Sequence, residues 1–161
     1  MIITNAQIKI RSSAGYFDKL FLSNLSKKAF GSFGDYGEIV LKWFESEYSR
    51  TLIATYKEMP VGFAMLGKPD NRNDPDNSAE LLAIAVVSEY SRLGIGSNLM
   101  KRIDKIAYEM GAKTLLLHTG VENKCAIKLF KNSGFKPWQI KNKFYPKGQD
   151  AFVMTKELNN L

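Results

Sequence analysis

The chain has 161 residues, of which 45% are hydrophobic and 24% charged, and its formal charge is +7 at pH 7. This size and composition predict one globular domain over residues 1–161. The longest apolar run, Leu81 to Val87, is too short to span a bilayer, and we expect a cytoplasmic protein because no secretory signal is visible. The chain has one cysteine, which excludes an internal disulfide. It also has only one histidine, so the usual zinc site of Cys and His ligands is excluded. A magnesium site built from carboxylates stays open but has no support.

Two helices and a hairpin are predicted in the first half of the chain. Apolar residues that alternate with polar ones indicate strands, whereas apolar residues that recur every three or four positions indicate helices. The expected elements are a strand over 7–12, a helix over 14–30, a loop over 31–37, a second helix before Thr51, strands over 51–56 and 61–66, and a mobile polar loop over 67–78.

The second half alternates strands and helices. The expected elements are a buried strand over 80–87, a helix over 97–110, a strand over 114–118, a helix over 124–133 capped by Asn123, and strands over 138–144 and 152–155. A strand, helix and strand in succession imply a parallel pair with a crossover, while the hairpin in the first half is antiparallel. We therefore expect an α/β (α+β) fold with a mixed, mostly antiparallel sheet, a central parallel pair and about four flanking helices.

The positive charge is concentrated in the last third of the chain. Between Lys101 and Lys147, eleven Lys and Arg residues stand against three acidic residues. Such a surplus suits a polyanionic partner, which could be a nucleic acid, an anionic membrane surface or a phosphorylated cofactor. Charge alone does not choose among these three.

A turn with two glycines, Gly94 and Gly96, joins the buried strand to the strongest predicted helix. Backbone N–H groups at a helix N-terminus attract an anion, and glycines let a phosphate approach these groups closely. The plainer interpretation is an ordinary strand-to-helix turn. A Rossmann turn is excluded because Leu99 stands where a third glycine is needed, and a P-loop is excluded because it needs G-K-S/T.

This turn resembles the central motif of the GNAT superfamily of N-acetyltransferases, which runs Gln or Arg, x, x, Gly, x, Gly or Ala. The corresponding residues run from Ser91 to Gly96. Val121 to Phe135 is similar to a second segment of the family, Asn-x-x-Ala-x-x-Leu-Tyr-x-x-x-Gly-Phe. The tail is similar to the ribosomal-protein alanine N-acetyltransferase branch. The resemblance covers residues 79–158 and implies a GNAT-like fold. It also implies an enzyme that moves an acetyl group from acetyl-CoA to a primary amine, by direct attack of the amine in a ternary complex.

The resemblance also implies roles for the matching positions. Backbone groups of residues 84–86 would pair with the pantetheine arm, and amides of residues 92–97 would hold the pyrophosphate. The implied cofactor-binding residues are Ile84, Ala85, Val86, Arg92, Leu93, Gly94, Ile95, Gly96, Ser97, Asn123 and Phe130. Two positions depart from the family pattern: Ser91 replaces the preferred Gln or Arg, and Phe130 replaces the tyrosine that protonates the departing thiolate in many relatives. A phenyl ring has no proton to give, so that role is vacant or moved.

Glu80 is the first candidate for the general base. It opens the buried strand, and strand alternation predicts that it shares one face with Leu82, Ile84 and Val86. It also falls where the histone-acetylating members of the family carry their glutamate base. The competing interpretation is an exposed carboxylate at the end of a strand.

His118 is the second candidate base, at the C-terminal end of the next buried strand, where open α/β sheets place their ligands. The competing interpretation is a hydrogen-bonded packing residue.

Tyr145 is the only candidate for a protein acid, and solvent could replace it. Cys125 has no evident base partner, so we expect direct transfer rather than an acyl-cysteine. A backbone N–H near Val86 would meet the developing oxyanion.

The acceptor remains open between a protein or peptide N-terminus and a small amine. Aromatic residues are expected to line its channel, namely Phe33, Tyr36, Trp43, Phe144 and Tyr145. One alternative is a CoA-binding module without catalysis, which the departures at Ser91 and Phe130 motivate. Another is a nucleic-acid-binding protein, which lacks a recognisable readout element. No membrane partner and no specific nucleic acid are expected, and a homodimer is compatible with the sequence.

Overall fold

The computed structural model describes residues 2–68 and 77–159. The elements are, in chain order, the 3₁₀ turn η1 (Asn5–Gln7), β1 (Ile8–Ser12), α1 (Gly15–Phe30), α2 (Tyr36–Glu45), β2 (Arg50–Tyr56), β3 (Met59–Gly67), β4 (Ser78–Val86), the 3₁₀ turn η2 (Ser88–Tyr90), α3 (Ile95–Glu109), β5 (Thr114–Gly120), α4 (Lys124–Asn132), β6 (Lys136–Lys141) and β7 (Ala151–Glu157). This order confirms the predicted succession of helices and strands.

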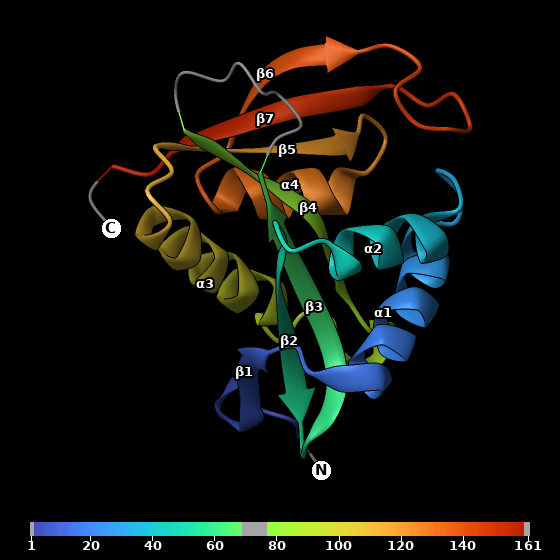
Figure 1. Cartoon of the computed structure of the whole chain (residues 1–161), viewed down its shortest axis with the longest axis vertical. Coiled ribbons are helices and arrows are strands. Elements are labelled where there is room, and N and C mark those ends of the chain that lie inside the picture. Colours follow the sequence, from blue (N-terminus) through green and yellow to red (C-terminus); the bar gives the residue numbers. More distant parts are fainter. Residues whose placement is uncertain (1, 69–76, 160–161) are drawn as a thin grey trace.

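The seven strands of the described residues form one sheet with the order β1-β2-β3-β4-β5-β7-β6. β4 and β5 pair in parallel, and every other neighbouring pair is antiparallel. The mixed sheet with a central parallel pair was predicted, and it is confirmed (Figure 1).

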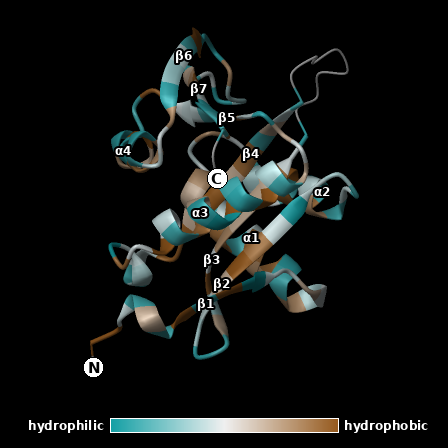
Figure 2. Cartoon of the chain, turned by 90° about the vertical axis from the view of Figure 1, so that its left-hand side faces the viewer, coloured by the Kyte–Doolittle hydropathy of each residue, from teal (hydrophilic) through white to brown (hydrophobic). Residues whose placement is uncertain are grey.

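The helices cover both faces of this sheet and enclose two cores. On one face Leu99 of α3 and Phe130 of α4 belong to the larger cluster of buried residues. On the other face Leu22 of α1 and Val40 of α2 belong to the smaller cluster. Figure 2 shows the central strands mostly in the hydrophobic colour, while α3 carries hydrophilic segments. The sequences of the central strands are therefore nearly continuous apolar runs, as expected for strands that helices cover on both faces.

β4 contains a bulge that corrects one prediction from the sequence. Met65 pairs with Ala83 and Leu66 with Leu81, so Leu82 is the extra residue. A bulge shifts the side-chain alternation beyond it. Glu80 and Leu82 consequently lie on the α1–α2 face, whereas Ile84 and Val86 pack toward α3.

The expectation that Glu80 shares a face with Ile84 and Val86 is therefore wrong. Strict alternation assumes an unbroken strand, and the pairing of β3 with β4 breaks it. The expectation holds for Leu82, which precedes the shift.

β4 and β5 separate toward their C-terminal ends. Their pairing runs only from Ser78 opposite Thr114 to Leu81 opposite Leu117. Beyond this point the two strands no longer pair, although β4 continues to Val86 and β5 to Gly120. The opening between them lies at the carboxyl ends of two parallel strands, where α/β sheets bind ligands.

Several boundaries differ from the predicted ones. β6 ends at Lys141 rather than 144, because Lys143 has a φ of 49° and the chain turns there. Phe144 and Tyr145 therefore lie in the β6–β7 loop. α3 begins at Ile95 instead of 97, directly after Gly94. Of the mobile loop predicted over 67–78, the two end residues belong to strands and residues 69–76 lie outside the described residues.

Within residues 2–68 and 77–159, the helices are all too short or too polar to cross a membrane.

A buried carboxylate fixes the start of α1. The N-cap residue Ala14 has no side chain to cap the helix, and Asp18 supplies the acceptor instead. Its Oδ2 accepts hydrogen bonds from the Ala14 amide at 2.7 Å and from Arg11 Nη1 at 2.6 Å, while Oδ1 accepts one from Arg11 Nη2 at 2.9 Å. The Arg11 guanidinium, helped by the Ala14 amide, holds the pKa of Asp18 below its usual range against the opposing effect of burial.

We expect Asp18→Asn to lower the free energy of unfolding by about 1–3 kcal/mol at pH 7. The pKa of Asp18 is lowered by folding, so its contribution is complete above the unfolded pKa of about 3.9 and is lost as the pH falls through the folded value. Urea unfolding at pH 7 and at successively lower pH should therefore show the two proteins converging in acid. Asp35→Asn is the matched control, because exposed Asp35 makes no cap hydrogen bond at the start of α2. An equal effect of both variants would contradict the assignment.

Candidate active site

A cavity of about 620 Å³ occupies the opening between β4 and β5. One end is lined by the turn that precedes α3, with Arg92, Gly94 and Ser97. The other end is lined by Glu80, His118 and a group of aromatic side chains. The cavity therefore connects a helix N-terminus with a pair of titratable side chains.

The glycine turn has the geometry that an anion site needs. Gly94 has a φ of 75° and Arg92 a φ of 63°, so the chain turns sharply before α3. Asn98 donates its amide to the Gly94 carbonyl at 3.0 Å, which starts the helical ladder. The amides just before it, of residues 95–97, are those that a helix leaves without helical partners. These residues line the cavity, so the turn fits a phosphate group.

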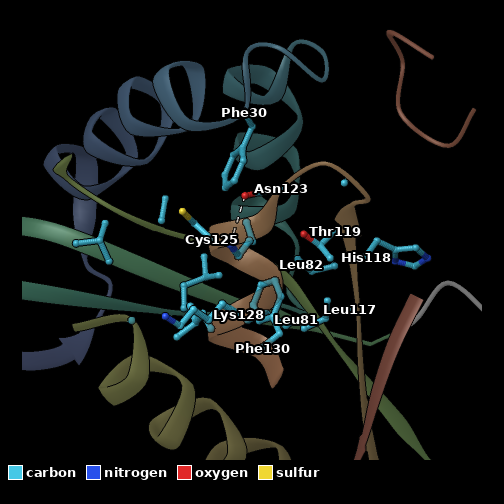
Figure 3. Close-up of a pocket in the computed structure, with 18 of the residues that line it drawn as sticks. Phe30, Leu81, Leu82, Leu117, His118, Thr119, Asn123, Cys125, Lys128 and Phe130 are labelled. Atoms are coloured by element: carbon cyan, nitrogen blue, oxygen red, sulfur yellow. Dashed lines mark hydrogen bonds between the residues drawn. The ribbon is translucent and has the colours of Figure 1, made fainter. Parts of the chain in front are cut away.

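α4 forms another wall of the cavity. Asn123 caps this helix, accepting a hydrogen bond from the Ala126 amide at 3.3 Å (Figure 3). Phe130 lines the cavity but is 4% exposed, because its ring also packs edge-to-face on Phe135 at 6.1 Å. In Figure 3 the sulfur of Cys125 and the imidazole of His118 point away from each other. His118 is therefore not placed as a base for Cys125.

Glu80 and His118 form a hydrogen-bonded pair. His118 Nδ1 lies 2.9 Å from Glu80 Oε1, and their side chains are 14% and 19% exposed respectively. When Nδ1 of the neutral imidazole donates to the carboxylate, the lone pair of the ring is on Nε2. Nε2 is buried and has no hydrogen-bond partner among the described residues. An unpartnered buried nitrogen in a cavity wall suits a role in proton transfer.

Aromatic rings surround this pair. Phe144 stacks on His118 with ring centres 4.4 Å apart and planes 3° apart. Tyr145 packs against Phe33 at 4.5 Å and lies 6.2 Å from the ring of Tyr36. Burial, with Tyr36 and the Glu80 carboxylate nearby, raises the pKa of Tyr145 well above the ordinary value of a phenol. Tyr145 therefore holds its proton tightly.

Two loops far apart in the sequence close this end of the cavity. Lys147 donates its amide to the Phe33 carbonyl at 3.2 Å and its ammonium to the Gly31 carbonyl at 2.8 Å. Gln149 Nε2 donates to the Ser32 carbonyl at 2.6 Å. The α1–α2 loop and the β6–β7 loop are thus joined by three hydrogen bonds.

The structure brings the expected site residues together with one exception. The residues that line the cavity as expected are Glu80, Ile84, Ala85, Val86, Arg92, Gly94, Ile95, Gly96, Ser97, His118, Asn123, Phe130 and Tyr145. Leu93 does not line it and packs against the core on the α3 face. All five aromatic residues expected at the acceptor channel, Phe33, Tyr36, Trp43, Phe144 and Tyr145, line the cavity as well.

Sequence reasoning missed three features. It did not pair Glu80 with His118, did not stack Phe144 on His118, and did not anticipate the contacts of Lys147 and Gln149 with the α1–α2 loop. No local sequence pattern predicts these contacts, because each joins residues that are distant in the chain. Among the described residues no three metal-ligating side chains cluster together.

Comparison with known proteins agrees with this geometry. The sequence profile described as the acetyltransferase (GNAT) family matches residues 19–135. An N-alpha-acetyltransferase of Sulfurisphaera tokodaii is 37% identical over 79 residues, which cover 48% of this chain and 47% of that protein. The chain spans about half the length of the first curated relatives it matches.

Solved structures show the same fold at low identity. The ribosomal-protein-S18-alanine N-acetyltransferase from Escherichia coli matches with a TM-score of 0.78 and 22% identity over 96% of both chains. The NatC complex bound to Gag peptide and CoA matches with a TM-score of 0.82 and 19% identity, over 94% of this chain and 98% of that chain.

Proposed function

Because the chain belongs to the acetyltransferase (GNAT) family, we propose that it transfers an acetyl group from acetyl-CoA to the amino terminus of a protein or peptide. One observation carries this proposal. The Glu80–His118 pair lies in the same cavity as the glycine turn at the start of α3. A phosphate site and a candidate base at two ends of one cavity suit a reaction between a phosphorylated donor and an amine.

The chain offers groups for each part of acetyl-CoA. The amides at the start of α3, with Arg92 and Lys128 in the cavity lining, would hold the phosphates. The free edge of β4 over residues 84–86 would hold the pantetheine arm. When bound, acetyl-CoA supplies an acetyl group activated as a thioester. Overall the C–S bond breaks, an amide C–N bond forms, and the acceptor ammonium loses two protons, one to the CoA thiol and one to solvent.

His118 is the proposed base and Glu80 its orienting partner. The Glu80 carboxylate holds the proton of Nδ1, so that the lone pair of Nε2 is available to the ammonium of the acceptor. This arrangement makes use of both candidates from the sequence. Tyr145, whose raised pKa favours a phenol that keeps its proton, would donate a hydrogen bond, and solvent would protonate the thiolate.

The lining of the cavity supports an acceptor with a single amine. Glu80 is the only carboxylate among the described lining residues, whereas a polyamine or an aminoglycoside carries several ammonium groups to neutralise. The aromatic end suits an apolar group beside the amine. The name of the curated relative, an N-alpha-acetyltransferase, and the peptide in the NatC complex support an α-amine of a polypeptide.

We expect peptides with a free N-terminus to be acetylated in preference to lysine side chains. An α-amine has a pKa of about 7.7–8.0 and a lysine about 10.4, so near pH 7.5 the neutral fraction differs by roughly 200- to 300-fold. The measurement is thiol release from acetyl-CoA with N-terminal peptides, lysine peptides, polyamines, amino acids and aminoglycosides.

The matched control is each N-terminal peptide with its α-amine already acetylated, which should release no thiol above the rate without acceptor. Faster reaction with lysine peptides or polyamines would contradict the proposed acceptor. Tight binding of acetyl-CoA without turnover of any amine would favour the alternative of a non-catalytic CoA-binding module, which the missing hydroxyl at Phe130 motivates.

The remaining expectations from the sequence keep the status of predictions. The single sheet, which includes strands from both halves of the chain, supports our proposal that residues 1–161 form one acetyltransferase domain. The cytoplasmic location and the homodimer stay predictions from the sequence.

A further inference from the structure

The ring of Phe144 lies flat on the imidazole of His118. The two ring centres are 4.4 Å apart and the planes differ by 3°. His118 belongs to β5, whereas Phe144 belongs to the β6–β7 loop, so the contact joins a strand to a loop that follows later in the chain. In Figure 3 His118 projects away from the α4 residues Cys125 and Lys128. Leu117 belongs to the larger core beneath α3 and α4, so strand alternation places His118 on the α1–α2 face of the sheet.

Phe144 supplies a restraint that Glu80 cannot supply. The hydrogen bond from Nδ1 fixes which nitrogen faces the carboxylate, but the ring can still tilt about this bond. A parallel ring against one face removes the tilt. Nε2 then has a fixed direction although no hydrogen bond holds it among the described residues.

The loop around Phe144 is itself fixed. The Lys143 amide donates to Asp150 Oδ1 at 2.8 Å, and the Tyr145 amide donates to the Gln149 carbonyl at 3.1 Å. The rings of Phe144 and Tyr145 meet edge-to-face at 5.1 Å. Phe144 nevertheless remains 40% exposed, so burial in the core does not explain its position.

We propose that Phe144 is a positioning residue for the acetyl transfer, holding the plane of the His118 imidazole so that Nε2 points at the incoming amine. This inference rests on the proposed function, in which His118 is the base. Phe144 has no acid, base or nucleophile, and it acts only through His118. Misplacing a catalytic group by about 1 Å can lower the rate by about 100-fold. Phe144 is not among the groups that would hold acetyl-CoA, so we expect the binding of the donor to be kept.

The test compares Phe144→Leu with Phe144→Tyr. Leucine keeps an apolar side chain but has no flat face, whereas tyrosine keeps the ring. We expect Phe144→Leu to lower kcat about tenfold with an unchanged KM for acetyl-CoA, and Phe144→Tyr to retain the wild-type kcat. Trp138→Leu is the control, because this exposed aromatic residue of β6 lies outside the cavity lining.

A second readout does not depend on activity. His118 is the only histidine in the chain, so its imidazole nuclei are assigned by NMR without ambiguity. In the wild type we expect its carbon-bound protons to be shifted upfield by the Phe144 ring and its nitrogens to report a proton on Nδ1. Phe144→Leu should remove the upfield shift and broaden or average the nitrogen signals.

Three results would overturn the inference. The first is a wild-type spectrum without the ring-induced shift. The second is a Phe144→Leu variant that loses the shift but keeps kcat. The third is a variant in which only the KM for the acceptor rises, which would make Phe144 a wall of the acceptor channel. If instead His118→Ala keeps full activity, the proposed base is wrong, and this outcome is distinct from all three.

Discussion

Replacing His118 with alanine should lower kcat for the amine acceptor by about 10²- to 10⁴-fold. The variant removes the only buried nitrogen in the cavity wall that is described without a hydrogen-bond partner. The binding of acetyl-CoA should not change, because His118 lies at the opposite end of the cavity from the α3 turn. Steady-state kinetics at saturating donor and acceptor, with calorimetric titration of acetyl-CoA, measure both quantities.

Glu80→Gln is the companion variant that separates the two candidate bases. Glutamine keeps an oxygen that accepts the Nδ1 proton of His118 but loses the negative charge. If His118 is the base, Glu80→Gln should retain more activity than His118→Ala. If Glu80 is the base, Glu80→Gln should lose as much activity or more.

A third outcome would contradict the catalytic interpretation of the pair. If both variants turn over at the wild-type rate while their melting temperatures fall, Glu80 and His118 have a structural role. The proton of the acceptor would then be lost directly to solvent.

Replacing Gly94 with alanine should weaken acetyl-CoA binding by about 10- to 100-fold, because a displaced amide loses a hydrogen bond to a charged group that contributes about 1.5–3 kcal/mol. Gly94 has a φ of 75°, a conformation that alanine adopts only with strain. A shift of this residue moves the amides at the start of α3, which line the cavity. The dissociation constant of acetyl-CoA, measured by calorimetry, tests the expectation.

Gly111→Ala is a matched control at the other end of the same helix. Gly111 has a φ of 84°, and an added Cβ would meet no atom within 4 Å. Alanine should therefore cost a similar conformational strain, about 1–2 kcal/mol, at both glycines. Equal weakening of acetyl-CoA binding by both variants would mean that the α3 turn is not the phosphate site.

Local sequence patterns were sufficient for most of the helices and strands. Asn123 and Gly134 bracket α4 as predicted, since a side-chain cap and a positive-φ glycine act on neighbouring backbone groups. The glycine turn before α3 was also predicted, because its two glycines follow a buried strand directly. The strand predicted to reach Phe144 was wrong, because exposed β6 shows no alternation of burial to mark its end.

The sequence by itself determined the succession of elements and the glycine turn before α3, because these depend on residues within a few positions of one another. It also supplied Glu80 and His118 as candidates, through the ends of the predicted strands and the resemblance to the family. Only the tertiary structure decided that Leu82 forms a bulge in β4, that Glu80 contacts His118, and that Phe144 stacks on the imidazole of His118. Those contacts depend on how strands pair and where loops fold back. Residues far apart in the chain meet only when the whole sheet has formed, and no local periodicity records which of them will touch.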